Sequence, residues 1–211
     1  PSVSPTSLTV PPWGNRTATL SVTVPSNAIG CTNDNITLTA TGTGVSDSDG
    51  CIAHATIVRG VDVSISPDYQ SGLNGATLSY TVTITNAGNV PDNYDLSVGD
   101  NLSWSPSISP SSLSLAPGAS DNASISVTIP LNATGCTGDL ITVTARSRSD
   151  NAIVGSDGCI AHVTIVRGVR VSVSPSYQSG LNGETLDYII TVSNTGNVED
   201  TYSLTATDDA G

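Results

Sequence analysis

The sequence predicts an all-β protein made of tandem immunoglobulin-like β-sandwiches, each with about seven strands. The first supporting observation is a long internal repeat: residues 51–90 return as residues 159–198, a shift of 108 positions, with 29 of the 40 residues identical. The second is the alternation of apolar and polar residues in short runs, which is typical of strands with one buried face. About seven such runs in one repeat match the strand number of an immunoglobulin-like sandwich. No run has the 3.6-residue period of a helix.

Three domains follow from the phase of the repeat. Gly30-Cys31 returns as Gly135-Cys136, a shift of 105 positions, so the second copy gains three residues in the loop at 149–154. The predicted domains are the C-terminal part of an Ig-like repeat at 1–60, a complete repeat at 61–168, and the N-terminal part of the next repeat at 169–211. We expect a window onto a longer array, or a subunit whose split ends complete each other, because open strand edges invite association.

The strands of the complete repeat are predicted from its alternating runs. Residues 78–85 alternate Leu, Tyr, Val and Ile with Ser and Thr, so one face of this strand is predicted to be buried. Asn, Gly and Pro residues that favour turns separate the runs, as at 73–75, 86–88 and 116–118. In chain order, the predicted strands are residues 61–65, 78–85, 94–98, 113–115, 125–129, 141–145 and 160–166, and the pattern of 78–85 recurs at 186–192.

Three segments of the complete repeat carry a resemblance to a known family. TVTITNAGNVPDNYDLSV at 81–98, SPSSLSLAPGASDNASISVTIP at 109–130 and ITVTARS at 141–147 resemble the NEW3/CARDB-type Ig-like repeats of archaeal and bacterial cell-surface proteins. The resemblance implies an extracellular, cell-surface location, because such modules form stalks, sheaths, S-layer parts, filaments or accessory domains of secreted hydrolases. One departure is that family members generally lack cysteines, whereas each unit here has two.

Composition excludes several classes of function. The chain has 18 acidic residues against six cations, all of them arginine, for a net charge of −12. Binding to nucleic acid or to anionic lipid is therefore not expected. The absence of lysine excludes Schiff-base and P-loop chemistry, and also Lys–Asn isopeptide crosslinks. No stretch of about 20 apolar residues is present, so we expect no direct membrane insertion in this segment. The start at Pro1, without a leader, suggests a piece of something longer.

Five Asn-X-Ser/Thr triplets predict N-glycosylation. They lie in or beside turn-rich loops or, for one of them, on the outward face of a predicted strand, where a glycan could be carried. The predicted acceptors are Asn15, Asn35, Asn101, Asn122 and Asn132.

Four cysteines in an apparently extracellular chain predict disulfides. They are Cys31, Cys51, Cys136 and Cys159. Pairing within a unit is the default. Alternating strand directions, however, place Cys31 and Cys51 at opposite poles, about 20 Å apart along a strand, whereas a disulfide needs Cα atoms within about 7 Å. The alternative is a longitudinal staple between successive units, joining Cys31 to Cys159 and Cys136 to the Cys51 equivalent of a following copy. Both pairings stay open.

No constellation of catalytic or cofactor-binding residues is found, so we expect the chain not to be an enzyme. His54 and His162 lie three positions after Cys51 and Cys159, and residues three apart on a strand face opposite ways, so they are not expected to bind a metal together. Calcium is the one cation considered, because acidic loops could supply oxygen ligands. The candidate ligands are Asp47, Asp49, Asp157, Asp100, Asp208 and Asp209.

The predicted function is a structural subunit of an extracellular filament, sheath or surface layer, built of glycosylated, disulfide-reinforced Ig-like repeats. Its expected partners are further copies of the chain, joined head to tail, and covalent glycans. The alternative is a stalk or carbohydrate-binding accessory segment of a secreted enzyme or adhesin. Trp13 and Trp104, the only tryptophans, either cap a core or contact a neighbouring domain or subunit.

Overall fold

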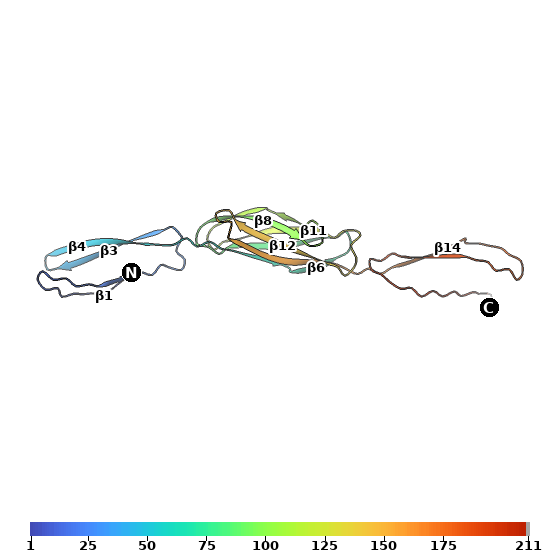
Figure 1. Ribbon diagram of the computed structural model, residues 1–211, viewed down its shortest axis with the longest axis horizontal. Coiled ribbons are helices and arrows are strands. Elements are labelled where there is room, and N and C mark those ends of the chain that lie inside the picture. Colours follow the sequence, from blue (N-terminus) through green and yellow to red (C-terminus); the bar gives the residue numbers. More distant parts are fainter. Residues whose placement is uncertain (210–211) are drawn as a thin grey trace.

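Two sheets packed face to face form the centre of the computed structural model, which describes residues 1–209 (Figure 1). One sheet has five strands in the order β10-β8-β12-β13-β6, and the other has four in the order β5-β7-β11-β9. Neighbouring strands are antiparallel, except that β13 and β6 are parallel. The bounds are β5 Val61–Ser66, β6 Tyr69–Gly72, β7 Thr77–Asn86, β8 Asp92–Asp100, β9 Ser107–Ser109, β10 Ser112–Leu115, β11 Ser120–Thr128, β12 Gly138–Ser147 and β13 Val154–Val163. The predicted Ig-like β-sandwich is confirmed.

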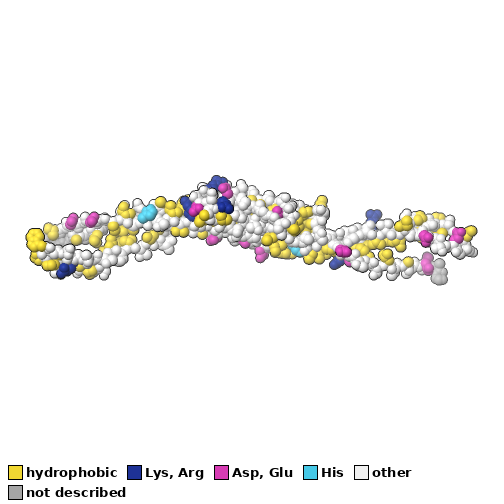
Figure 2. All heavy atoms as spheres, in the orientation of Figure 1, with side chains coloured by type: hydrophobic (Ala, Val, Ile, Leu, Met, Phe, Trp, Pro, Cys, Tyr) yellow, Lys and Arg dark blue, Asp and Glu magenta, His cyan; other side chains and the backbone are white. Residues whose placement is uncertain are grey.

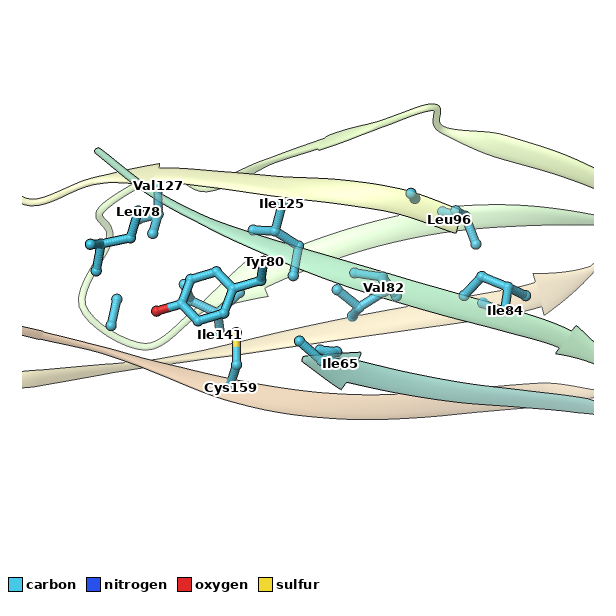
Figure 3. Packing of buried hydrophobic residues seen from close by; sticks show 14 of the residues in the cluster. Ile65, Leu78, Tyr80, Val82, Ile84, Leu96, Ile125, Val127, Ile141 and Cys159 are labelled. Atoms are coloured by element: carbon cyan, nitrogen blue, oxygen red, sulfur yellow. The ribbon is translucent and has the colours of Figure 1, made fainter. Parts of the chain in front are cut away.

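The core lies between these two sheets and consists of the inward residues of the alternating runs. Tyr80 of β7 lies beside Ile141 of β12 and Cys159 of β13, and Ile84 of β7 lies beside Leu96 of β8, all of them buried (Figure 3). Burying each such side chain contributes about 1.5–3 kcal/mol. Trp104 is partly buried and packs against this cluster, so it caps the end of a core.

Some element boundaries differ from the sequence prediction. The short strands β6 and β9 were not predicted, because each is a polar edge strand with too few residues to show alternation. The prediction that Asp47, Asp49 and Asp157 lie in loops is wrong, because these residues lie within ten-residue strands. Backbone pairing along one edge, with β3 for Asp47 and Asp49 and with β12 for Asp157, holds them there despite their low strand propensity. Strand β13 ends at Val163 rather than at residue 166.

The N-terminal part carries four strands that correspond to the second part of the central unit. They are β1 Ser2–Ser4, β2 Thr19–Ser21, β3 Asn33–Gly42 and β4 Val45–His54. β1 pairs with β2, with Val3 opposite Leu20, as β9 pairs with β11 with Ile108 opposite Ile125. β3 pairs with β4, with Ile36 opposite Cys51, as β12 pairs with β13 with Ile141 opposite Cys159. The repeat in sequence is therefore a repeat in strand pairing.

The C-terminal part corresponds to the first part of the central unit. β14 Val169–Ser174 and β15 Ile189–Asn194 form an antiparallel pair, as β5 and β7 do. Val173 lies opposite Ile190, matching Ile65 opposite Val82. The predicted strand at 186–192 is paired only from Ile189 onward.

Both outer parts expose faces whose equivalents are buried in the central unit. Ile190 is 51% exposed, whereas the equivalent Val82 is 0% exposed. Leu38 in the N-terminal part is 44% exposed, whereas the equivalent Val143 is 0% exposed. Hydrophobic side chains are accordingly visible along both outer parts in Figure 2. Each outer part is thus one half of a sandwich, with its core face open.

Candidate functional site: the joints and the open half-sandwiches

One asparagine side chain clamps the joint between the N-terminal part and the central unit. Asn89 accepts a hydrogen bond at Oδ1 from the Val58 N–H (2.8 Å), and its Nδ2 donates to the Thr56 carbonyl (2.9 Å). The Asn89 N–H donates to the Val58 carbonyl, and the Gly30 N–H donates to the Asn89 carbonyl, both at 2.9 Å. Four bonds from one residue therefore fix two crossing backbone segments to the turn that follows β7.

The second joint repeats this arrangement with Asn197. Its Oδ1 accepts from the Val166 N–H and its Nδ2 donates to the Thr164 carbonyl, both at 2.8 Å. The Gly135 N–H donates to the Asn197 carbonyl at 2.7 Å. Nδ2 of Asn197 also donates to Oδ1 of Asn74 at 2.8 Å. Because two independent joints have the same bonds, the relation between successive units is a built feature of the repeat.

Glycines at the joints allow the backbones to approach closely. A Cβ atom on Gly88 would lie 2.6 Å from the Val58 carbonyl oxygen, and one on Gly30 would lie 2.6 Å from Asn89 Oδ1. At the second joint, a Cβ on Gly135 would lie 2.5 Å from Asn197 Oδ1. Any larger residue at these positions would force the joint apart.

An ion pair braces the strand that leaves each joint. Arg59 contacts Asp92 at 2.9 Å, and Arg167 contacts Asp200 at 2.9 Å. Burial alone would raise the pKa of Asp92. Hydrogen bonds from Ser147, Ser149, the Asn93 N–H and Arg59 outweigh that effect, so the pKa lies below the ordinary value. The carboxylate thus stays charged and holds the joint down to acidic pH.

A second buried carboxyl group has a pKa above the ordinary value. Asp139 lies at the start of β12 and is fully buried. Burial raises its pKa, and the nearby Asp100 carboxylate raises it further, although the Leu102 and Asn101 N–H groups donate to Oδ1. The ionised Asp139 carboxylate therefore destabilises the folded state at neutral pH.

Sequence reasoning missed the asparagine clamp. It placed the turn at 86–88 correctly but gave no role to Asn89 or Asn197. Both belong to a Gly-Asn-Val triplet that recurs with the 108-residue shift, one position beyond the residues that the turn needs. That recurrence of a polar side chain outside a turn was the available signal.

All five predicted glycosylation acceptors have exposed side chains. Asn35 lies on β3 next to the buried Ile36, on the opposite face. Asn122 lies on β11, where its Oδ1 accepts a bond from Thr83 Oγ1, and Asn101 Oδ1 accepts a bond from the Leu140 N–H. Asn15 lies between β1 and β2, and Asn132 lies beside the second joint. Attachment of glycans stays a prediction.

The four cysteines lie within the described residues, and none is joined by a disulfide. The Cys31 N–H donates to the carbonyl of Ala55, the residue that follows β4. Ala55 lies four residues beyond Cys51, which corresponds to about 13 Å of extended chain. That separation is too long for a pair within the unit. Likewise, the Cys136 N–H donates to the carbonyl of Val163, which lies four residues beyond Cys159.

The longitudinal staple expected between Cys31 and Cys159 is also not present. Cys159 was predicted near the pole of its unit, and this position is wrong. It is the sixth residue of β13, 1% exposed, with its side chain in the core, because β13 begins at Val154 and not beside the cysteine. Burial raises the pKa of its thiol to about 11, so the thiol is unreactive at neutral pH.

The histidines and acidic residues occupy structural positions. His54 Nδ1 lies 2.6 Å from Asn33 Oδ1, and the ring of His162 lies 5.6 Å from that of Tyr69. Asp157 accepts bonds from the Ile65 and Gly158 N–H groups. Asp47 and Asp49 accept from the N–H groups that follow them. Among residues 1–209, which include Asp100, Asp208 and Asp209, no group of three metal-ligating side chains is found.

A family model described as the VWA7 Ig-like domain matches residues 66–167, slightly less than half of the chain. No curated protein sequence matches this chain. Within residues 1–209 there is no helix that could cross a membrane.

Three solved structures illustrate the structural likeness. A PapD-like domain of human CEP192 is 15% identical over 49% of this chain and 84% of that chain, with a TM-score of 0.35. An α2-macroglobulin of Escherichia coli is 16% identical over 55% of this chain and 19% of that one, with a TM-score of 0.39. Surface layer protein SbsC is 12% identical over 76% of this chain and 25% of that one, with a TM-score of 0.37.

These structures are too distant to bear on function. The expected NEW3/CARDB type is not the family that matches. The family match and the two-sheet architecture together show an immunoglobulin-like domain at the centre of the chain.

Proposed function

We propose that this chain is a structural subunit of an extracellular filament, sheath or surface layer, in which copies join head to tail. The observation that carries the proposal is the match between the two open halves. The C-terminal part of one copy supplies equivalents of β5 and β7, and the N-terminal part of the next supplies equivalents of β9, β11, β12 and β13.

The central unit shows which bonds the completed unit would contain. There, β7 pairs with β11, with Tyr80 opposite Ile125. Applying the repeat shifts, Tyr188 of one copy would lie opposite Leu20 of the next. The added pairing satisfies backbone groups that the outer half-sheets leave open, which is how strand complementation supplies affinity.

Two further bonds of the central unit link the same parts. The Ile65 N–H donates to Asp157 Oδ2, and the Tyr80 hydroxyl donates to the Ile160 carbonyl, both at 2.8 Å. The equivalent donors are Val173 and Tyr188 of one copy, and the equivalent acceptors are Asp49 and Ile52 of the next. Every group needed for both bonds is thus kept in the outer parts.

An extracellular location is supported by the surface. Five accessible Asn-X-Ser/Thr triplets offer covalent attachment of glycans. The net charge of −12 keeps such a polymer soluble between its contacts. The rigid joints at Asn89 and Asn197 make each added unit extend a rod.

Sedimentation velocity of the unglycosylated chain over a range of concentrations tests the proposal. The mean mass is expected to grow with concentration. Leu38→Asp places a charge on the open core face and is expected to stop growth, because burying an unpaired charge costs several kcal/mol. Thr37→Asp adds the same charge on the outward face and is the matched control, since the equivalent Thr142 is exposed. A wild-type chain that stays monomeric at all concentrations would overturn the proposal.

A further inference from the structure

We infer that Trp13 of one copy docks beside Leu131 of the preceding copy, and that this apolar pair makes the joint between copies stronger than the joint within a chain. The inference rests on the proposed head-to-tail assembly and deepens it by naming the residues that select a second copy as the partner.

The joint within the chain shows where the two residues would meet. The Pro117-Gly118 loop, which precedes β11, lies against residues 26–29 and beside Gly88 and Asn89, around a hollow of about 230 Å³. The Gly118 N–H donates to the Asn86 carbonyl at 2.9 Å, so this loop is fixed at the end of β7, beside the turn that carries Asn89.

The second joint has a corresponding hollow, but within residues 1–209 no loop equivalent to Pro117-Gly118 lines it. It is lined by residues 131–134 together with Asn194, Gly196 and Asn197, and measures about 390 Å³. The repeat shifts relate 131–134 to 26–29, and Gly196 and Asn197 to Gly88 and Asn89. Its missing wall is the equivalent of the Pro117-Gly118 loop, which in the N-terminal part is Pro12-Trp13.

Among the equivalent residues that line the two hollows, three positions differ. Ile29 of the joint within the chain corresponds to Thr134 of the joint between copies. At the other two positions, Gly118 and Ser26 within the chain correspond to Trp13 and Leu131 between copies. Trp13 is fully exposed and Leu131 is 84% exposed, so most of the surface of both side chains is open to a partner.

The backbone of Trp13 is already in the conformation of the joint. Its φ is 62°, close to the 71° of Gly118. A left-handed conformation is favourable for glycine and costs a bulky residue of order 1–3 kcal/mol. A tryptophan at such a position is therefore explained by what its side chain contacts. The turn between β1 and β2 lies at the end of the N-terminal part farthest from the centre (Figure 1), where a preceding copy would lie.

Trp13 would thus supply a large apolar contact that is present only in the head-to-tail joint between copies. Tryptophan is the residue most enriched among those that dominate interface affinity, and it acts in a pocket from which water is excluded. Because Trp13 and Leu131 belong to two different surfaces, one in the N-terminal part and one beside the second joint, the contact is heterologous and propagates as a filament. Asn132 lines the same hollow, so the test uses chain made without N-glycans.

The test compares head-to-tail affinity among the wild-type chain, Trp13→Gly, Leu131→Ser and the double variant, by sedimentation. Each substitution installs the residue of the joint within the chain. Trp13→Gly is expected to weaken association at least about 30-fold. In the Leu131→Ser background its effect is expected to be several-fold smaller, because the partner is already gone. The Trp13 emission is expected to shift to the blue on polymerisation, while the shielded Trp104 supplies a constant signal.

Three outcomes separate the claims. A polymerising wild type with a weakened Trp13→Gly supports both the assembly and the anchor. A polymerising wild type with an unweakened Trp13→Gly, or with unshifted Trp13 emission, overturns the anchor alone. A wild type that stays monomeric overturns both.

Discussion

Removing one inward side chain from the open C-terminal half is expected to weaken assembly while leaving the single chain folded. Ile190→Ala is the substitution of choice, because Ile190 lies on the core face of β15 and matches Val82 of the central core. Ile189→Ala is the matched control. Ile189 is the neighbouring residue on the opposite face, and its equivalent, Thr81, is exposed in the complete unit.

The magnitude follows from exposure. Ile190 is 51% exposed in the single chain, and Val82 is 0% exposed, so about half of the side chain is buried only on assembly. Truncating a fully buried isoleucine to alanine costs about 2–5 kcal/mol. The share lost from association is therefore about 1–2.5 kcal/mol, or about a 5- to 70-fold increase in Kd.

Sedimentation equilibrium gives the association constant of each variant, and thermal unfolding reports on the central unit. Ile190→Ala is expected to raise the Kd without changing the Tm of the central unit. Ile189→Ala is expected to leave both unchanged. Equal weakening by the two variants, or none by Ile190→Ala, would refute the assignment of the inward face of β15 to a joint core.

Three further predictions concern the central unit and its first joint. Asp92→Asn is expected to destabilise the central unit by about 2 kcal/mol at pH 7. Since the pKa of Asp92 is lowered on folding, the difference from wild type in denaturant titrations should shrink as the pH falls through that lowered pKa; a constant difference would contradict this. Asp139→Asn is expected to raise the Tm at pH 7, because the raised pKa of Asp139 makes its ionisation unfavourable in the folded state, and the gain should vanish below about pH 4; a lower Tm at pH 7 would count against it. Gly88→Ala is expected to loosen the first joint and broaden the distance distribution in small-angle scattering, whereas Gly99→Ala, with open space around its Cβ, should not; identical profiles would contradict the close-approach argument.

The strands of the central unit were predictable because their alternation is strong. The runs at 78–85 and 141–145 place an apolar residue at every second position, and they lie within the observed strands β7 and β12. The phase of the repeat also predicts two partial units. The signal for the strands is a local two-residue period, whereas the signal for the partial units comes from comparing segments that lie 105 to 108 residues apart.

The joints were not predictable in the same way. The bonds of Asn89 join it to Thr56 and Val58, more than 30 residues away, and no local pattern specifies that pairing. The position of Cys159 was misjudged because β13 extends through an Asp-Gly segment of low strand propensity. There, the ladder with β12 outweighs local preference.

Cryo-electron microscopy of polymers grown from the purified chain tests the central claim most directly. The account predicts a rod with two sandwiches per chain. In every second sandwich, β15 of one copy pairs with β2 of the next, and the sheet they form packs against β3 and β4 of that next copy. It also predicts density for the Trp13 side chain beside Leu131 of the preceding copy. A polymer whose half-sandwiches remain open, or are covered by another surface of the chain, would contradict the account.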